Sequence, residues 1–168
     1  SDKILGLLDE ATDNRRNYLN PVNAYDENWT PTLLGYCVNR SSSDRVSIRI
    51  AEMYLIAAEA GSYLPSELNN AKKYLLDLQK KRLTPEGYAA KETAVEAMNA
   101  EQLRAEVADE RARELLMEGH RWMDLRRTTR PSITKTHNGS TYTLTENDSR
   151  YTLPFPQSAV NNNPHLND

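Results

Sequence analysis

The sequence ERARELLMEGHRWMDLRR, residues 110–127, combines charged and large apolar side chains in an unusual way. Nine of its eighteen residues are charged, and five of these are arginines. An ordinary apolar core does not hold that many arginines, and a solvated helix face does not usually hold so many large apolar groups. The stretch therefore indicates either ion pairs buried between helices or a functional site.

Glu110, Glu114 and Glu118 lie about one helical turn apart, a spacing that paired catalytic carboxylates can use. Arginines of the same stretch are interleaved with them. Nearby guanidinium groups lower the pKa of a carboxyl group, which is the wrong direction for a general acid. We therefore interpret the stretch as structural ion pairs, since the planar guanidinium group can bind a carboxylate through two hydrogen bonds.

Other catalytic or metal-binding patterns are weak in this sequence. His120 and Asp124 can share a helical face, but without a second histidine or an HExxH pattern simple packing is favoured over a metal site. The single cysteine, Cys37, excludes an internal disulfide and is interpreted as a small apolar packing residue rather than a catalytic thiol. There is no glycine-rich phosphate loop and no Gly-x-Ser-x-Gly motif. We expect no enzyme activity, no metal and no cofactor.

Composition bounds the class of protein and its partners. The chain has 168 residues, a formal net charge of −3 and an isoelectric point near 5.7, so it carries no basic surface for nucleic acid. No apolar run approaches the roughly 20 residues that a membrane-spanning helix needs. The sequence begins SDKILGLLDE, without a signal peptide, so either the protein is cytoplasmic or its natural start has been removed.

Apolar periodicity and capping residues predict a mainly α-helical fold. The expected helices cover 44–61, 66–83 and a stretch that begins after Asn99, with a looser segment over 84–98. Asp44 is the expected N-cap of the first helix, whose predicted inward face includes Ile50 and Met53. Asn99 and Gln102 predict a capping box, and Gly119 is expected to end or bend the third helix.

Beyond Pro131 the pattern changes to β-structure. Asn138-Gly139 fits a tight turn between two β-prone runs, and 150–156 is expected to form a further strand. The helical hairpin near 44–83 has the length of a tetratricopeptide-like unit. We predict tetratricopeptide-like helix pairs with a small β-hairpin near the C-terminus. Residues 1–44 are expected to be an irregular, loop-rich segment that continues from a missing N-terminal part, and 45–168 to form the helical domain.

Aromatic residues outside the expected helices are the candidate ligand contacts. Tyr25, Trp29 and Tyr36 lie in the N-terminal segment, and Tyr142 and Tyr151 lie near the C-terminus. Exposed rings can stack on sugar faces, and the alternative is that these rings pack over helix ends. The first three are our candidates for ligand binding.

Three blocks of the sequence, namely 49–60 (RIAEMYLIAAEA), 110–127 and 151–156 (YTLPFP) with Asn163-Pro164, together resemble the C-terminal region of the SusD/RagB family of glycan-binding lipoproteins. Residues 49–60, RIAEMYLIAAEA, are similar to the family's R-x-A-E-x-Y-L-x-x-A-E-A helix. Residues 110–127 are similar to its E-R-x-x-E-L-x-x-E-G-x-R-W-x-D-L-x-R motif. Residues 151–156, YTLPFP, with Asn163-Pro164, are similar to its closing elements.

The resemblance implies a non-catalytic, SusD-like helical protein on the outer face of a Gram-negative outer membrane. It implies capture of oligosaccharide, starch-like or of another kind, for a SusC-like TonB-dependent transporter. The membrane link would be a lipid anchor absent from this chain, because family members are much longer and begin with a lipidated cysteine. The matched motif residues carry over as structural framework: Glu110, Arg111, Glu114, Glu118, Arg121, Trp122, Asp124 and Arg127.

We further expect the charged third helix to dock on the first, with Arg49, Glu52 and Glu59 as partners and further framework residues. If the pairs are buried, alanine at Glu114 or Arg121 should cost roughly 3 kcal/mol or more. The alternative function is a tetratricopeptide-type protein–protein interaction scaffold without its own ligand site. A glycoside hydrolase is a third possibility.

Overall fold

The computed structural model of this chain describes residues 6–38, 49–163 and 165. These residues form two compact units, one ending at His120 and the other beginning at Arg121. The expected domain boundary near residue 44 and the expected N-cap Asp44 lie outside the described residues.

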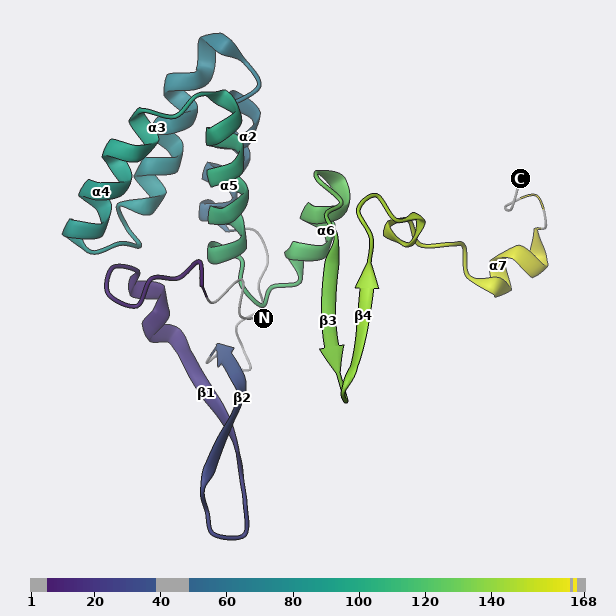
Figure 1. Ribbon diagram of the computed structural model, residues 1–168. Helices are drawn as coiled ribbons and strands as arrows, with labels where there is room; N and C mark the ends of the chain where they lie inside the picture. The colour runs from purple at the N-terminus through teal and green to yellow at the C-terminus, as the bar shows by residue number, and fades with distance from the viewer. Residues whose placement is uncertain (1–5, 39–48, 164, 166–168) are drawn as a thin grey trace. The chain divides into compact units, whose positions relative to one another are not determined.

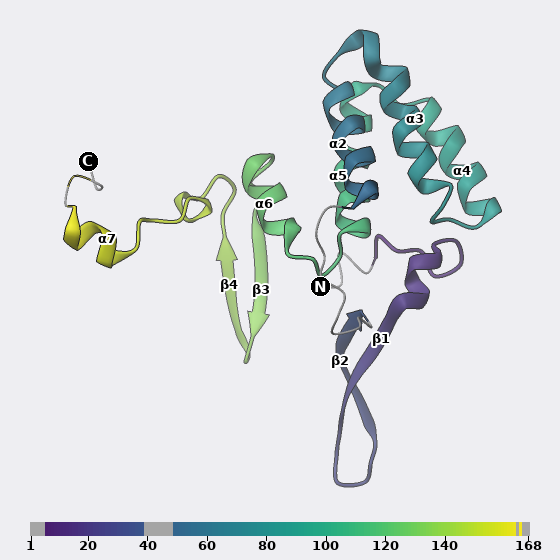
Figure 2. The same ribbon diagram turned by 180° about the vertical axis from the view of Figure 1, so that it is seen from behind.

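The fold is mainly α-helical with a small β-hairpin near the C-terminus, as predicted. The described α-helices of the first unit are α2 (Ile50–Gly61), α3 (Leu68–Gln79), α4 (Pro85–Glu96) and α5 (Ala100–Glu114). Helix α2 packs against both α3 and α5, and α3 also packs against α4 (Figure 1). Figure 2 shows the same packing of α2 to α5 from behind.

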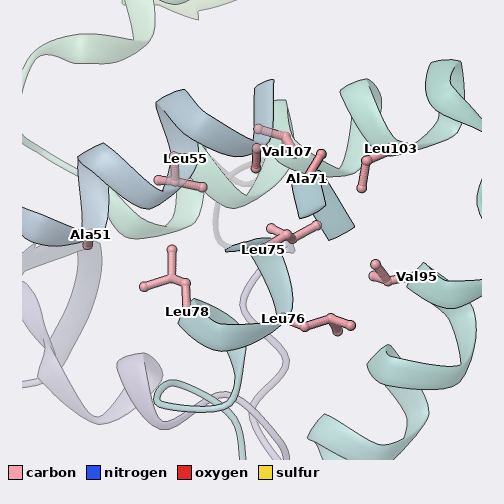
Figure 3. Packing of buried hydrophobic residues seen from close by; sticks show 10 residues of the cluster. Ala51, Leu55, Ala71, Leu75, Leu76, Leu78, Val95, Leu103 and Val107 are labelled. Atoms are coloured by element: carbon pink, nitrogen blue, oxygen red, sulfur yellow. The ribbon is translucent and has the colours of Figure 1, made fainter. Parts of the chain in front are cut away.

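The apolar core of the first unit lies between these helices (Figure 3). Leu55 of α2, Leu75 of α3 and Leu103 of α5 are completely buried there. Complete burial of a leucine side chain contributes on the order of 1.5–3 kcal/mol. The buried members of the core are Ala51, Leu55, Ala58, Ala71, Leu75, Leu76, Leu78, Val95, Leu103 and Val107.

The buried face of α2 differs from the predicted one. Ile50 is 77% exposed and Met53 is 45% exposed, whereas Ala58 is completely buried. The prediction is therefore wrong for Ile50 and Met53, and the buried stripe of α2 runs through Ala51, Leu55, Ala58 and Gly61. Gly61 serves the contact with α3, since a Cβ atom there would lie 3.0 Å from the Cβ atom of Ala71 on α3.

Local capping explains the ends of the other helices. The capping box of α5 is present as predicted, because Asn99 and Gln102 each accept a hydrogen bond from the other's backbone N–H. The expectation of a looser segment over 84–98 is wrong, since α4 occupies most of it. Thr84 caps this helix by accepting a hydrogen bond from the Gly87 N–H group, and Pro85 occupies the first turn, where its missing N–H group costs nothing.

The N-terminal segment is more regular than expected. A 3₁₀ turn (Asn14–Tyr18) leads into β1 (Leu19–Tyr25), which pairs antiparallel with β2 (Pro31–Val38). Pro21 lies within β1, and because the described residues form only two strands of this sheet, its missing N–H group can face outward. Before β1, the carbonyl oxygen of Thr12 accepts a hydrogen bond from the N–H group of Thr84, at the start of α4. The N-terminal segment therefore packs on the helices.

The second unit contains α6 (His120–Arg127), β3 (Ile133–His137), β4 (Ser140–Leu144) and α7 (Gln157–Asn162). Strands β3 and β4 form the predicted hairpin, and Asn138 and Gly139 both have positive φ, as the predicted turn requires. The expected strand over 150–156 is wrong. Tyr151 instead ends a 3₁₀ turn (Ser149–Tyr151) that is capped by Asp148.

The corrected face of α2 predicts a contrast between two substitutions. Leu55→Ala should lower the free energy of unfolding by about 2–5 kcal/mol, because it leaves a cavity in the core. Ile50→Ala, on the exposed face of the same helix, should change it by no more than about 0.5 kcal/mol. Urea unfolding of both variants measures the contrast. Equal losses would contradict this assignment of the buried face.

Candidate functional site

Three arginines converge on the Glu114 carboxylate at the end of α5. Arg15 of the N-terminal segment donates to one carboxylate oxygen at 3.0 Å, and Arg49, just before α2, donates to the other at 2.5 Å. Arg82, after α3, binds both oxygens at 2.8 Å. The Glu114 side chain is only 1% exposed. A single buried carboxylate thus joins three segments that are far apart in the sequence.

Glu110, one turn earlier, lies at the centre of a second group of contacts. One oxygen accepts from Arg15 at 2.6 Å, and the other accepts from Arg113 at 2.8 Å and from the Gln79 side chain at 3.0 Å. Burial raises the pKa of the Glu110 carboxyl group, but the charges of Arg15 and Arg113 outweigh it and lower the pKa from 4.5 to about 2. We call Arg15, Arg49, Arg82, Arg113, Glu110 and Glu114 the ion-pair cluster.

The turn after α5 continues this network toward α2. Arg49 donates to the Glu118 carboxylate and to the Glu114 carbonyl oxygen. Arg111 approaches Glu52 of α2 at 3.5 Å. Met117 and Gly119 have positive φ, so the turn bends sharply and brings Glu118 back toward Arg49. The expected docking of α5 on α2 is therefore present, with Arg49 and Glu52 among the contacts.

The remaining framework residues have the following surroundings within their own units. Glu59 is half-buried on α2. In the second unit, Asp124 pairs with Arg127 at 3.0 Å and Arg121 is half-buried. Trp122 stacks on the buried ring of Tyr151, with ring centroids 5.0 Å apart, and the Tyr151 hydroxyl group donates to the Pro131 carbonyl oxygen. These contacts bind α6 to the segment that follows the hairpin.

The chemistry of the ion-pair cluster is structural. With a pKa of about 2, Glu110 remains ionised at neutral pH and has no proton to donate as a general acid. Glu114 is almost inaccessible, and both of its oxygens already accept hydrogen bonds from guanidinium groups. Neither carboxylate is therefore free to act as a general acid.

Sequence reasoning missed two arginines of the cluster and Gln79. Arg15 precedes Glu110 by 95 residues, and Arg82 precedes Glu114 by 32. Neither belongs to a recognisable motif. The only available signal was the excess of carboxylates in 110–118 that required partners from elsewhere in the chain.

The candidate aromatic residues have three different surroundings. Tyr25 and Trp29 lie at the β1–β2 turn, with ring centroids 5.8 Å apart and exposed fractions of 57% and 80%. Tyr36 is half-buried on β2, and the Arg16 guanidinium group lies 5.3 Å from its ring centroid. Tyr142 is exposed on β4, whereas Tyr151 is completely buried and has no free face.

Other expected features are placed as follows. Cys37 is exposed on β2, so its interpretation as a packing residue is wrong. Within the described residues, no group of three or more histidine, cysteine, aspartate or glutamate side chains could hold a metal ion. No described helix is both long enough and apolar enough to cross a membrane.

The comparison with protein families identifies the chain. The model of the SusD family (SusD/RagB) matches residues 23–168, which contain the aromatic turn, the helices from α2 to α5 and the whole second unit. The chain belongs to the SusD family. A search of curated proteins gives no match.

Membership in the SusD family indicates a glycan-binding protein of nutrient uptake. Proteins of this family are generally non-catalytic binding proteins, and they are typically lipoproteins at the surface of the outer membrane. The residues 110–127 that carry the family motif include the buried glutamates of the ion-pair cluster.

Removal of the Glu114 carboxylate should strongly destabilise the first unit. Glu114→Ala leaves three guanidinium groups without their shared partner, and loss of one partner of a buried ion pair costs about 3–5 kcal/mol. Glu10→Ala is the matched control, because Glu10 is 79% exposed and its pair with Arg16 should contribute no more than about 1 kcal/mol. Chemical unfolding measures both. A loss below about 0.5 kcal/mol for Glu114→Ala would contradict the structural role.

The lowered pKa of Glu110 predicts loss of stability in acid. A carboxyl group with a depressed folded-state pKa stabilises the fold fully above its unfolded-state value and loses this contribution as pH falls through the folded value. For Glu110 the loss should occur between about pH 4.5 and pH 2. Glu110→Gln removes this titration, so its unfolding free energy should decrease less steeply over that interval than that of the unsubstituted chain. Parallel pH profiles from urea unfolding would contradict the assignment.

Proposed function

We propose that this chain belongs to a cell-surface protein that captures oligosaccharides for import through a SusC-like TonB-dependent transporter. Membership in the SusD family carries this proposal. The protein acts without catalysis, holds the glycan at the outer membrane surface and delivers it to the transporter. A lipid anchor on the full-length protein attaches it to the membrane.

We assign glycan contact to the turn between β1 and β2. A sugar ring has apolar C–H faces that stack on aromatic rings, and Tyr25 and Trp29 offer two exposed rings at a mutual angle of 51°. Trp29 has a φ of 59°, a conformation that is rare for a bulky residue. Such backbone conformations are enriched at ligand-binding positions, where the surrounding structure must hold them.

Hydrogen bonds hold this turn in shape before a ligand arrives. The Asp26 carboxylate accepts from the N–H groups of Asn28 at 2.8 Å and Thr30 at 2.9 Å, and the Trp29 N–H group donates to the Asp26 carbonyl oxygen at 3.1 Å. A preformed turn loses little conformational entropy on binding. Tyr36 is the weaker candidate, because Arg16 already covers part of its ring.

The absence of catalysis is supported by the state of the central glutamates. Glycoside hydrolysis requires a carboxylic acid with a raised pKa beside a second accessible carboxylate. Glu110 instead has a lowered pKa, and Glu114 is enclosed by arginines. These side chains support the binding protein as scaffold.

A protein–protein interaction scaffold is the alternative, and the exposed face of α2 favours it. Ile50, Met53 and Ile56 are 77%, 45% and 47% exposed on one helix. Exposed apolar side chains at helical spacing can bind a protein partner such as the transporter. Under this alternative the chain has no glycan site of its own.

Glycan affinity electrophoresis separates the two functions. Retention of the chain in a gel that contains polysaccharide should be lost in Trp29→Ala, with an apparent Kd at least about tenfold weaker, because an exposed stacking ring dominates such a contact. Tyr142→Ala, which removes a ring of similar exposure on β4, should retain normal affinity.

Two other results would contradict this assignment. Equal retention of the Trp29→Ala and unsubstituted chains would place the glycan contact elsewhere. No retention on any polysaccharide, together with capture of the transporter that Met53→Asp abolishes, would favour the scaffold function.

A further inference from the structure

A cavity of about 90 Å³ lies inside the first unit, where the N-terminal segment meets α3, α4 and α5. It is separate from the aromatic turn, and no step of glycan capture uses it. Side chains and backbone from all four parts of the chain form its wall, including Thr12, Asp13, Gln79, Gly87, Lys91 and Arg113.

The wall contains one buried acceptor without a donor. Gln79 is completely buried, and its Nε2 atom donates to Glu106 at 3.1 Å and to Glu110 at 3.0 Å. These two carboxylates fix the orientation of the amide group, because a flipped amide would bring its oxygen against them. Among the described residues, no group donates a hydrogen bond to Gln79 Oε1. A buried acceptor without a hydrogen bond destabilises the fold by about 1–3 kcal/mol. A bound group that donates a hydrogen bond to Gln79 Oε1 would remove this cost.

The charges on the wall favour a neutral occupant. Lys91 and Arg113 disfavour a cation, and the carboxylates of Asp9, Asp13 and Glu110 disfavour an anion. A hydroxyl group fits this mixture, since it donates one hydrogen bond and accepts others. The Lys91 ammonium group donates to Glu106 at 2.7 Å, and further N–H groups remain for an occupant. The volume exceeds the roughly 10–15 Å³ that a water molecule needs.

The cavity is bounded by a close contact that depends on glycine. A Cβ atom at Gly87 would lie 2.6 Å from the Cβ atom of Thr12, nearer than two such atoms approach, so only glycine lets the N-terminal segment lie against the start of α4. The occupant therefore lies at the junction of this segment with the helices.

We propose that this cavity is a binding site for a small neutral hydroxyl compound, which donates a hydrogen bond to Gln79 Oε1. Water is one source of that hydroxyl group, and a short polyol of about ethylene glycol size is the other. The bound hydroxyl joins the N-terminal segment to α3 and α5. The inference does not depend on the proposed glycan function, because it rests on Gln79 and the cavity alone.

Crystallography of the 168-residue chain tests the site directly. Crystals are grown and frozen without glycerol or glycols, and the map is inspected at a resolution that defines water. We expect an oxygen within about 2.7–3.2 Å of Gln79 Oε1. An empty cavity, or a protein group that donates directly to Oε1, would overturn the proposal.

Solution NMR distinguishes the two sources of the hydroxyl group. Ethylene glycol is titrated while the side-chain amide of Gln79 and the backbone amide of Gly87 are followed. Gln102 is the control, since its side chain belongs to the exposed capping box. Saturable shifts at Gln79 and Gly87, without one at Gln102, assign the site to polyols as well as water.

Shifts that are absent at Gln79, together with a long-lived water contact to its amide, assign the site to water alone. If neither a saturable shift nor a long-lived water contact is found at Gln79, the proposal is wrong. Equal shifts at all three amides would show only a general solvent effect, and the polyol part of the proposal would then be wrong.

Discussion

The first unit depends on a carboxylate at the end of α5 that three arginines share. Arg15, Arg49 and Arg82 reach Glu114 from the N-terminal segment, the start of α2 and the end of α3. Arg15 lies in a 3₁₀ turn, and Arg49 and Arg82 lie in connections that flank helices, where apolar packing alone specifies little. Transfer of charges into the interior costs several kcal/mol per ion, so such a cluster is retained only when each charge finds good partners. The main role of the contacts between Glu114 and the three arginines is therefore to fix where these segments meet, and their net contribution to the free energy of unfolding is smaller.

Two charges of the cluster, on Glu114 and Arg49, lie at helix ends where the helix dipole disfavours them, and their ion pair compensates for this effect. A carboxylate near a helix C-terminus and a cation near a helix N-terminus both interact unfavourably with the helix dipole. Glu114 ends α5, and Arg49 immediately precedes α2 without a capping hydrogen bond from its side chain. Their mutual ion pair joins the two disfavoured charges across the helices. Tertiary pairing therefore decides the conformation here, while local propensity opposes it.

Features set by neighbouring residues were predictable from the sequence. The capping box at Asn99 and the hairpin turn at Asn138-Gly139 depend on contacts within a few residues, and both are present. Features set by distant contacts were not predictable. Arg15 and Arg82 carry no local signal, and nothing near Gly87 in the sequence indicates its close approach to Thr12. The inward placement of Ile50 and Met53 was wrong because contacts with the distant helices α3 and α5 bury a neighbouring stripe of α2 that includes Leu55 and Ala58.

Family membership and ligand choice depend on different residues of this chain: the first on buried side chains and the second on exposed ones. The glutamates that carry the family motif are buried in arginine contacts, so they specify a fold and leave no group for a ligand. Recognition has to come from exposed side chains, and loops held by a rigid scaffold are the usual place for it. The turn at Trp29 has these properties, since its backbone is fixed by Asp26 while its ring is 80% exposed. Substitutions at such a turn can change the ligand while the interior, and with it the family motif, stays the same. The family match therefore constrains the fold of this chain much more tightly than it constrains the glycan.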